Sequence, residues 1–294
     1  MPSLTLAEAA QLGRRAVESW IADRAPSMGA AIAYYTLFSL APLLLIVISV
    51  AGLMFGEEAA RGEIFGQLQA LVGPKGALAV QGLLQSVNWP AGSVLGTVTG
   101  VGLMLVGATS VFAELQNTLD RIWRAPARPL NSVWALLRAR LLSFGLILGL
   151  GFLLIVSLLL GAALSALQKW WSPLFGGWDW LVALLDQSLN FGLLTVMFAL
   201  IYKIMPRVQV AWSDVWLGAV TTAGLFSIGR YLIGLYIGTS AVASGFGAAG
   251  SLVVLLVWVY YSAQIFLLGA EFTWVCAHAI GSRRHLPLPP SLDR

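Results

Sequence analysis

The sequence contains little charge, one cysteine and two histidines. Charged residues make up 10% of its 294 residues and hydrophobic residues 59%, whereas soluble domains carry about 25% charged residues. Cys276 alone cannot form an intrachain disulfide, and one cysteine with two histidines provides no metal-ligand spacing. The composition excludes a soluble globular enzyme and indicates an all-α membrane protein. We expect no catalytic residues, no metal and no cofactor.

Long apolar stretches predict how the chain crosses the membrane. A spanning helix needs about 20 mostly apolar residues, and six stretches qualify: 28–55, 94–113, 141–168, 181–205, 214–238 and 251–275. They predict a six-transmembrane-helix bundle within a membrane domain, 26–280, followed by a tail, 281–294. The connection 56–93 contains the sequence Gly73-Pro74-Lys75-Gly76. It predicts two short amphipathic helices on the outer face, separated by a turn.

The first 25 residues predict a helix that lies on the membrane surface. Thr5 and Glu8 have the spacing of a capping box, and Pro26 disfavours helix at the residue before it, which ends the helix near Arg24. The apolar residues that share one side at helical spacing are Leu6, Ala9, Ala10, Val17, Trp20 and Ile21. Such an amphipathic helix is typical of the membrane interface.

Lysine and arginine set the expected orientation. With the N-terminus in the cytoplasm, the cytoplasmic segments hold 13 of these residues and the outer segments hold 3, apart from Arg230. Positive charge gathers on the cytoplasmic side of membrane proteins, so both termini are predicted to be cytoplasmic. The arginine-rich loop 121–140 is interpreted as a contact for anionic membrane lipids. We expect no binding to nucleic acid.

Arg230 stands alone as a charge in an apolar stretch of spanning length. A guanidinium in hydrocarbon costs about 2.5–3.5 kcal/mol on insertion scales, so it needs a polar environment. Three interpretations remain open: an ion pair with Asp186 that locks the bundle, a site that binds an anionic head group in a cavity with Asn190, and an arginine that extends to the outer interface.

A second set of polar residues is predicted at another depth. Glu114 and Glu271 fall near the cytoplasmic surface, about 30 Å into their spans at 1.5 Å per residue. Either the cytoplasmic Arg121 and Arg207 neutralise them, or they act in a gate or in proton coupling. Pro42 is expected to kink the first span beside Ser39. The residues grouped as gate or coupling candidates are Glu114, Glu271, Gln264, Ser39 and Pro42.

Glycine-rich patterns suggest close backbone contacts. The segment 238–251 is uncharged and contains Gly245 and Gly247; it either folds back to line a cavity or forms a tight outer turn. Glycines also recur every four residues, which allows helices to approach closely. These repeats are interpreted as packing within the bundle or as a homodimer face: Gly92, Gly96 and Gly100; Gly145 and Gly149; Gly234 and Gly238.

Three motifs resemble the YihY/virulence factor BrkB family: residues 30–42, Ala-Ala-Ile-Ala-Tyr-Tyr-Thr-Leu-Phe-Ser-Leu-Ala-Pro; residues 114–123, Glu-Leu-Gln-Asn-Thr-Leu-Asp-Arg-Ile-Trp; and residues 256–264, Leu-Val-Trp-Val-Tyr-Tyr-Ser-Ala-Gln, followed by Gly269-Ala-Glu271. The resemblance covers nearly the whole chain. It implies a six-helix protein of the bacterial inner membrane. Members have carried the label ribonuclease BN, and transport roles have been suggested for others.

The favoured function is transport or export of an anionic or amphiphilic solute through a polar cavity near Arg230. The alternative is a scaffold or partner protein of the cell envelope that transports nothing. Ribonuclease activity is not favoured, because RNA hydrolysis needs a metal cluster or an acid–base set, and the cytoplasmic segments offer only scattered Asp120, Asp214 and two terminal histidines.

Overall fold

Every regular element of the described residues is an α-helix. The computed structural model describes residues 6–86, 94–126, 179–239 and 250–284, together with isolated positions between 145 and 161. Its long helices are α1 (Leu6–Ala22), α2 (Ala25–Phe55), α3 (Glu57–Ser86), α4 (Val94–Ile122), α6 (Asp179–Ile204), α7 (Trp212–Thr239) and α9 (Gly250–Ala279). The all-α prediction is confirmed for this part of the chain.

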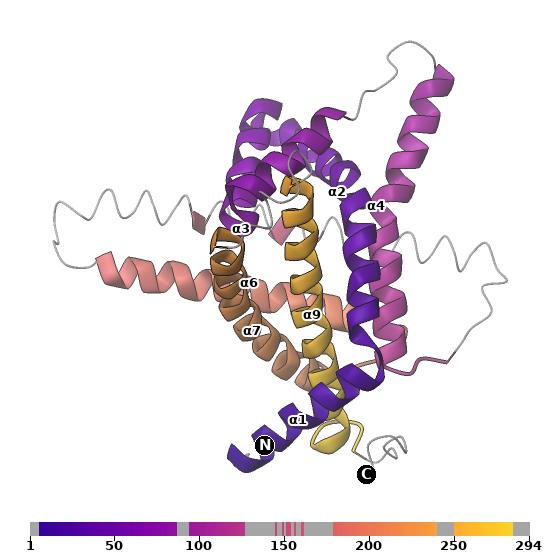
Figure 1. Ribbon diagram of the computed structural model, residues 1–294, viewed down its shortest axis with the longest axis vertical. Coiled ribbons are helices and arrows are strands. Elements are labelled where there is room, and N and C mark those ends of the chain that lie inside the picture. The colour runs from indigo at the N-terminus through magenta and orange to yellow at the C-terminus, as the bar shows by residue number, and fades with distance from the viewer. Residues whose placement is uncertain are drawn as a thin grey trace.

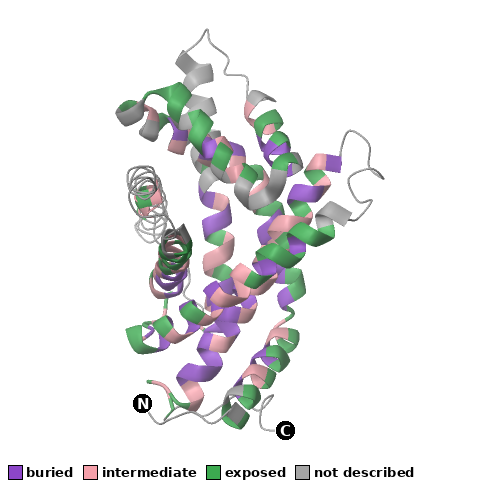
Figure 2. Cartoon of the chain, turned by 90° about the vertical axis from the view of Figure 1, so that its left-hand side faces the viewer, coloured by how far each residue is buried: buried purple, intermediate pink, exposed green. Residues whose placement is uncertain are grey.

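Helix α9 is the central element of the bundle (Figure 1). It packs against α1, α2, α3 and α7, while α2 also packs against α4, and α6 packs against α7. Helix α1 and the last turns of α9 lie at one end of the molecule, called the α1 end below, and α3 lies at the other. In Figure 2 the buried positions face the inside of the bundle and the exposed positions face outward.

Glycines set an antiparallel register between α7 and α9. A Cβ on Gly218 would overlap Thr273, and one on Gly269 would overlap the hydroxyl oxygens of Thr222 and Tyr202. In the first turn of α7, Asp214 meets Gly281, which follows the end of α9, in the same antiparallel order. These positions lack a side chain because the two helix backbones lie close together, which is how helices pack in a bilayer.

Three of the glycines noted in the sequence for their regular spacing do not make these contacts. A Cβ on Gly145, Gly149 or Gly234 would meet nothing within 4 Å. Close approach instead uses Gly29, Gly107, Gly218, Gly229, Gly269 and Gly281, which are spread over several elements. Glycine spacing within one helix did not identify these six positions, because the side chains of the facing helix determine where the two backbones come close.

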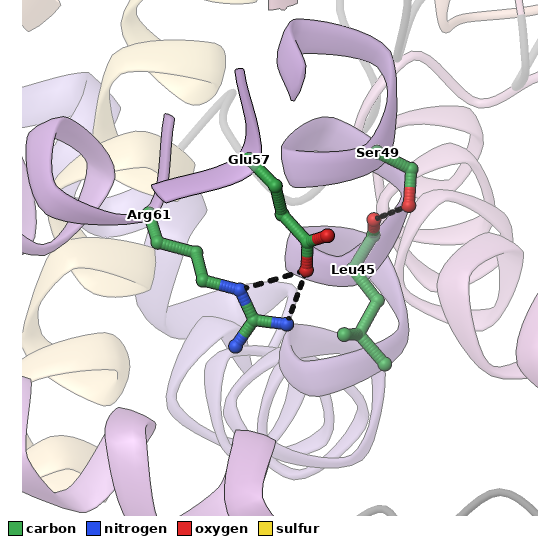
Figure 3. A network of polar contacts seen from close by, with 4 residues as sticks. All are labelled: Leu45, Ser49, Glu57 and Arg61. Carbon is green, nitrogen blue, oxygen red and sulfur yellow. Dashed lines mark hydrogen bonds and ion pairs between the residues drawn. The ribbon is translucent and has the colours of Figure 1, made fainter. Parts of the chain in front are cut away.

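The two short helices and the turn predicted for 56–93 are corrected by the structure. One helix, α3, runs from Glu57 to Ser86 and includes Pro74. It begins after Gly56, whose φ of 87° ends α2. Across the first turns of α3, Arg61 donates two hydrogen bonds to Glu57, at 3.0 and 2.7 Å (Figure 3). Ile64 and Val80, on either side of Pro74, pack into one cluster with α2 and α9. This packing outweighs the local preference of the glycine–proline sequence for a turn.

The N-terminal helix forms as expected, but a different face of it packs on the bundle. Leu12, Ala16 and Ser19 are buried, and they share one side at a spacing of three to four residues. Val17 and Ile21, assigned to the membrane-facing side, are exposed, Ile21 by 62%. Helix α1 is therefore docked on α9 through a face that the sequence did not single out.

Three helical stretches are long and apolar enough to cross a membrane: Ala25–Ser49, Ala183–Ile204 and Gly250–Ala279. They correspond to the first, fourth and sixth predicted spans. Helices α4 and α7 occupy the second and fifth. Most of the third predicted span, 141–168, lies outside the described residues.

The register of α7 and α9 generates a stability prediction. We expect Gly269→Ala to lower the free energy of unfolding by about 1–3 kcal/mol, because the added methyl group forces Thr222 and Tyr202 out of a packed interior. Gly234→Ala is the matched control, since its methyl group meets nothing within 4 Å and alanine favours helix. Thermal unfolding in detergent micelles compares the two. Equal unfolding temperatures would contradict the register.

Candidate functional site

Arg230 lies on an exposed flank of α7. Its neighbours Ile228, Tyr231 and Leu232 are exposed as well. Along the antiparallel helices, Arg230 is opposite about residue 261 of α9, roughly 15 Å along the axis from Glu271 at 1.5 Å per residue. The register of α7 against α9 therefore agrees with the prediction that Arg230 and Glu271 lie at different depths.

Asp186 does not pair with Arg230 among the described residues. It accepts a hydrogen bond of 3.2 Å from Asn190, one turn further along α6. Two contacts set the register of α6 against α7: Tyr202 with Thr222, at 3.1 Å, and Phe198 with Phe226. In this register Arg230 is opposite about residue 194 of α6. Asp186 lies two turns beyond that point. Gly245 and Gly247, the other residues expected near Arg230, lie outside the described residues.

Ser39 and Pro42 lie where α2 meets α4. The Ser39 hydroxyl donates to the Tyr35 carbonyl at 2.7 Å and lies 2.8 Å from the hydroxyl of Ser110. Gly107 makes room for the proline ring, because a Cβ there would be 3.2 Å from Pro42 Cγ. The structure thus joins these two gate candidates to α4, the helix that also contains the candidate Glu114.

Gln264 lies in the middle of α9, over the backbone of Gly29 in α2. Its amide nitrogen and oxygen are both buried, and neither has a hydrogen-bond partner among the described residues. A buried amide without partners is costly.

Glu271 is the most deeply buried charged residue in the described part of the chain, with 0% of its surface exposed. Ser19 of α1 donates a hydrogen bond of 2.8 Å to its Oε2. The carboxyl group of Asp23, which directly follows the same helix, and the guanidinium of Arg124 both act on Glu271 through their charges. Glu271 Oε1 and Asp23 Oδ2 are both buried without a partner among the described residues. The site therefore joins two carboxyl groups, one hydroxyl and one guanidinium.

Arg124 is held beside this site by unusual backbone and by an aromatic ring. Its φ of 49° places it in the left-handed region directly after α4, a conformation that residues other than glycine seldom adopt. Its guanidinium lies 5.4 Å from the centre of the Trp274 ring, within cation–π range. Its Nη2 lies 3.7 Å from Asp23 Oδ1. Arg124 thus links the end of α4 to both α1 and α9.

Further polar contacts surround the site at the α1 end. Asp120 accepts the backbone N–H of Arg207 at 2.8 Å, and the Arg207 side chain lies 3.2 Å away. Burial raises the pKa of the Asp120 carboxyl above its ordinary value, and these contacts with Arg207 offset part of that rise. Asp214 accepts a hydrogen bond of 2.6 Å from the Ser282 hydroxyl. These contacts join α4, α7, the connection before α7 and the segment after α9.

The two glutamates have different charged neighbours. Arg121 acts on Glu114 through its charge, as the sequence suggested. Glu271 is approached by Arg124, whereas Arg207 pairs with Asp120. Ser19, Asp23 and Arg124 were not among the site residues predicted from the sequence. Ser19 is 252 residues from Glu271, so no local spacing could connect them. Among the described residues, no three His, Cys, Asp or Glu side chains form a metal-binding group.

Comparison with known proteins provides a family context for this geometry. The profile of a family described as "Virulence factor BrkB" matches residues 16–291. A "UPF0761 membrane protein" of Azotobacter vinelandii is 30% identical over 280 residues, which cover 92% of this chain and 64% of that protein. One of Tolumonas auensis is 29% identical, covering 85% of this chain and 80% of its own length. No solved structure matches.

The family profile spans the Glu271 site. Ser19, Asp23, Arg124 and Glu271 all fall within residues 16–291. The chain spans 64% of the length of the Azotobacter vinelandii protein and 60% of that of a relative from Verminephrobacter eiseniae, which is 31% identical.

The Asp214–Ser282 contact generates a prediction about the segment after α9. We expect Asp214→Ala to speed cleavage by trypsin after Arg283 and Arg284 by about tenfold, because losing a buried charged hydrogen bond costs about 1–3 kcal/mol. Asp186→Ala in α6 is the control, since its partner is Asn190. Timed digestion with mass spectrometry measures the rates. Equal rates for the two variants would show that Asp214 does not hold this segment.

Proposed function

Since the chain belongs to the Virulence factor BrkB family and is a membrane protein, we propose that it transports an anionic or amphiphilic solute across the bacterial inner membrane. In this proposal six helices span the membrane and both termini are cytoplasmic, so that the α1 end faces the cytoplasm. The excess of lysine and arginine in the segments assigned to that side supports the orientation.

The observation that carries the proposal is the complete burial of Glu271 within α9. An ionisable residue inside a spanning helix is expensive, and such residues mark ion and substrate pathways or proton relays. A purely structural role is better served by an apolar residue, because replacing buried ion pairs with apolar residues is often neutral or stabilising. The scaffold alternative offers no comparable reason for a carboxyl group at this position.

We assign the α1–α9 contact around Glu271 to a cytoplasmic gate. Helix α1 covers the last turns of α9 through Leu12, Ala16 and Ser19. Its polar contacts with the rest of the bundle include Ser19 with Glu271 and Asp23 with Arg124. A contact held by few polar groups can be broken by a change in charge, which is a property required of a gate.

Arg230 is assigned to the solute side of the same pathway. It lies about 15 Å from the level of Glu271 along the helix axis at 1.5 Å per residue, and its guanidinium is suited to a carboxylate, sulfate or phosphate group. Because Arg230 is exposed on the flank of α7, the proposed pathway follows that flank. That the chain is not an enzyme and that glycine faces form a homodimer both stay predictions from the sequence.

Uptake into proteoliposomes tests the proposal. The probes are a radiolabelled bile salt, a fatty acid and a lysophosphatidic acid, each compared with empty liposomes under a pH gradient. We expect the protein to accelerate accumulation of at least one probe, and Glu271→Gln and Arg230→Gln each to slow it by about tenfold, the equivalent of about 1.4 kcal/mol in the barrier.

Glu18→Gln is the matched control for this assay. Glu18 lies on the exposed side of α1, paired with Arg14, so its loss should leave uptake unchanged. If the protein accelerates none of the three probes, it does not transport anionic amphiphiles. If it accelerates uptake equally with Glu271→Gln, the gate assignment is wrong.

A further inference from the structure

We propose that Asp23 and Glu271 bind one proton between them, and that this shared proton holds α1 against α9. The two carboxyl groups come from opposite ends of the sequence and meet at the α1 end of the bundle, where Ser19, one turn before Asp23, donates a hydrogen bond to Glu271 and Arg124 lies 3.7 Å from Asp23. One oxygen of each is buried without a hydrogen-bond partner among the described residues. Two ionised carboxylates can only accept hydrogen bonds, so a proton is the missing donor between them.

The charges around the pair support a bound proton. One guanidinium, that of Arg124, faces two carboxyl groups. It lies closer to the outside, with a side chain 43% exposed against 14% for Asp23. If both carboxyl groups were ionised, one negative charge would remain unbalanced in a buried site, which is strongly unfavourable. Two carboxyl groups that share a site resolve this by keeping one proton.

Among the described residues, the other elements packed around Glu271 add no compensating charge. Helix α2 contains no charged residue, and Arg24, which precedes it, is exposed and is not among the charges that act on Glu271. Asp214, the acidic residue in the first turn of α7, acts on Cys276 and His278. On α9 itself, His278 stacks on Trp274 with ring centres 4.4 Å apart and contacts the Trp274 carbonyl. Along α4, Glu114 interacts with Arg121, and Asp120 pairs with Arg207.

The shared proton makes the α1–α9 contact sensitive to pH in a definite direction. With the proton bound, Asp23 and Glu271 attract each other through one hydrogen bond, and α1 stays docked. When the proton leaves, two negative charges face each other and the contact weakens. Docking is therefore favoured at low pH and lost as pH rises. The proton site does not rest on the transport proposal, because proton binding needs no solute.

Infrared spectroscopy of the protein in lipid nanodiscs tests this inference directly. At neutral pH we expect the stretching band of a protonated carboxyl group, with a shift in heavy water and a loss at alkaline pH. Glu271→Gln should remove the band. Glutamine can still donate a hydrogen bond to Asp23, so this variant is expected to fold.

Two further variants separate a shared proton from simple burial of Glu271. Asp23→Asn removes the neighbouring charge, so the band should move to another frequency, and the proton affinity of the site should change by about tenfold, one pH unit in the midpoint. Asp120→Asn is the control and should leave the band unchanged, because Asp120 pairs with Arg207.

Three results would overturn the inference. The first is the absence of a protonated carboxyl band in the unmodified protein at neutral pH. The second is a band that survives Glu271→Gln. The third is a band whose frequency and midpoint are the same in Asp23→Asn, which would show that Glu271 holds its proton without Asp23.

Discussion

The hydrogen bond between Ser19 and Glu271 marks the contact on which the α1 end depends. A carboxyl group that is 0% exposed has lost its hydration, and the protein must replace water with its own polar groups. Those groups come from α1 and from Arg124, two residues after the end of α4. Helix α1, the end of α4 and α9 therefore have to meet at one place, and the need to satisfy Glu271 brings together segments from both ends of the sequence.

The rest of the bundle provides a rigid frame for this contact. Helices α7 and α9 approach closely at Gly218 and Gly269, and Tyr202 of α6 donates a hydrogen bond to the Phe266 carbonyl at 2.7 Å. Trp274, one turn beyond Glu271 along α9, is fixed between Arg124 and His278. A polar site on such a frame can change its charge while its supporting helices stay in place, which is useful in a gate.

The sequence predicts the helices better than it predicts the site. Apolar stretches of spanning length correspond to α2, α4, α6, α7 and α9, because burial in a bilayer forces backbone into helix whatever the local preferences. The prediction of a turn at Gly73–Gly76 was wrong. Helix α3 continues through it because Ile64 and Val80, on either side of Pro74, pack into the same cluster. Glu271 was identified from the cost of a charge in a spanning helix. Ser19 and Asp23 were not, because contacts between distant segments leave no pattern in a single sequence.

Accessibility of the α1–α9 contact tests the central claim most directly. Ala16 is buried in this contact and Val17 beside it is exposed. In a Cys276→Ala background, a membrane-impermeant maleimide labels Ala16→Cys in one variant and Val17→Cys in another. The labelling rate of the first is divided by that of the second, because this ratio removes the intrinsic effect of pH on thiol reactivity. The account predicts that this ratio rises severalfold from acidic to alkaline pH and becomes independent of pH in Glu271→Gln. A ratio that stays constant in the unmodified site, or that rises equally with Glu271→Gln, would contradict it.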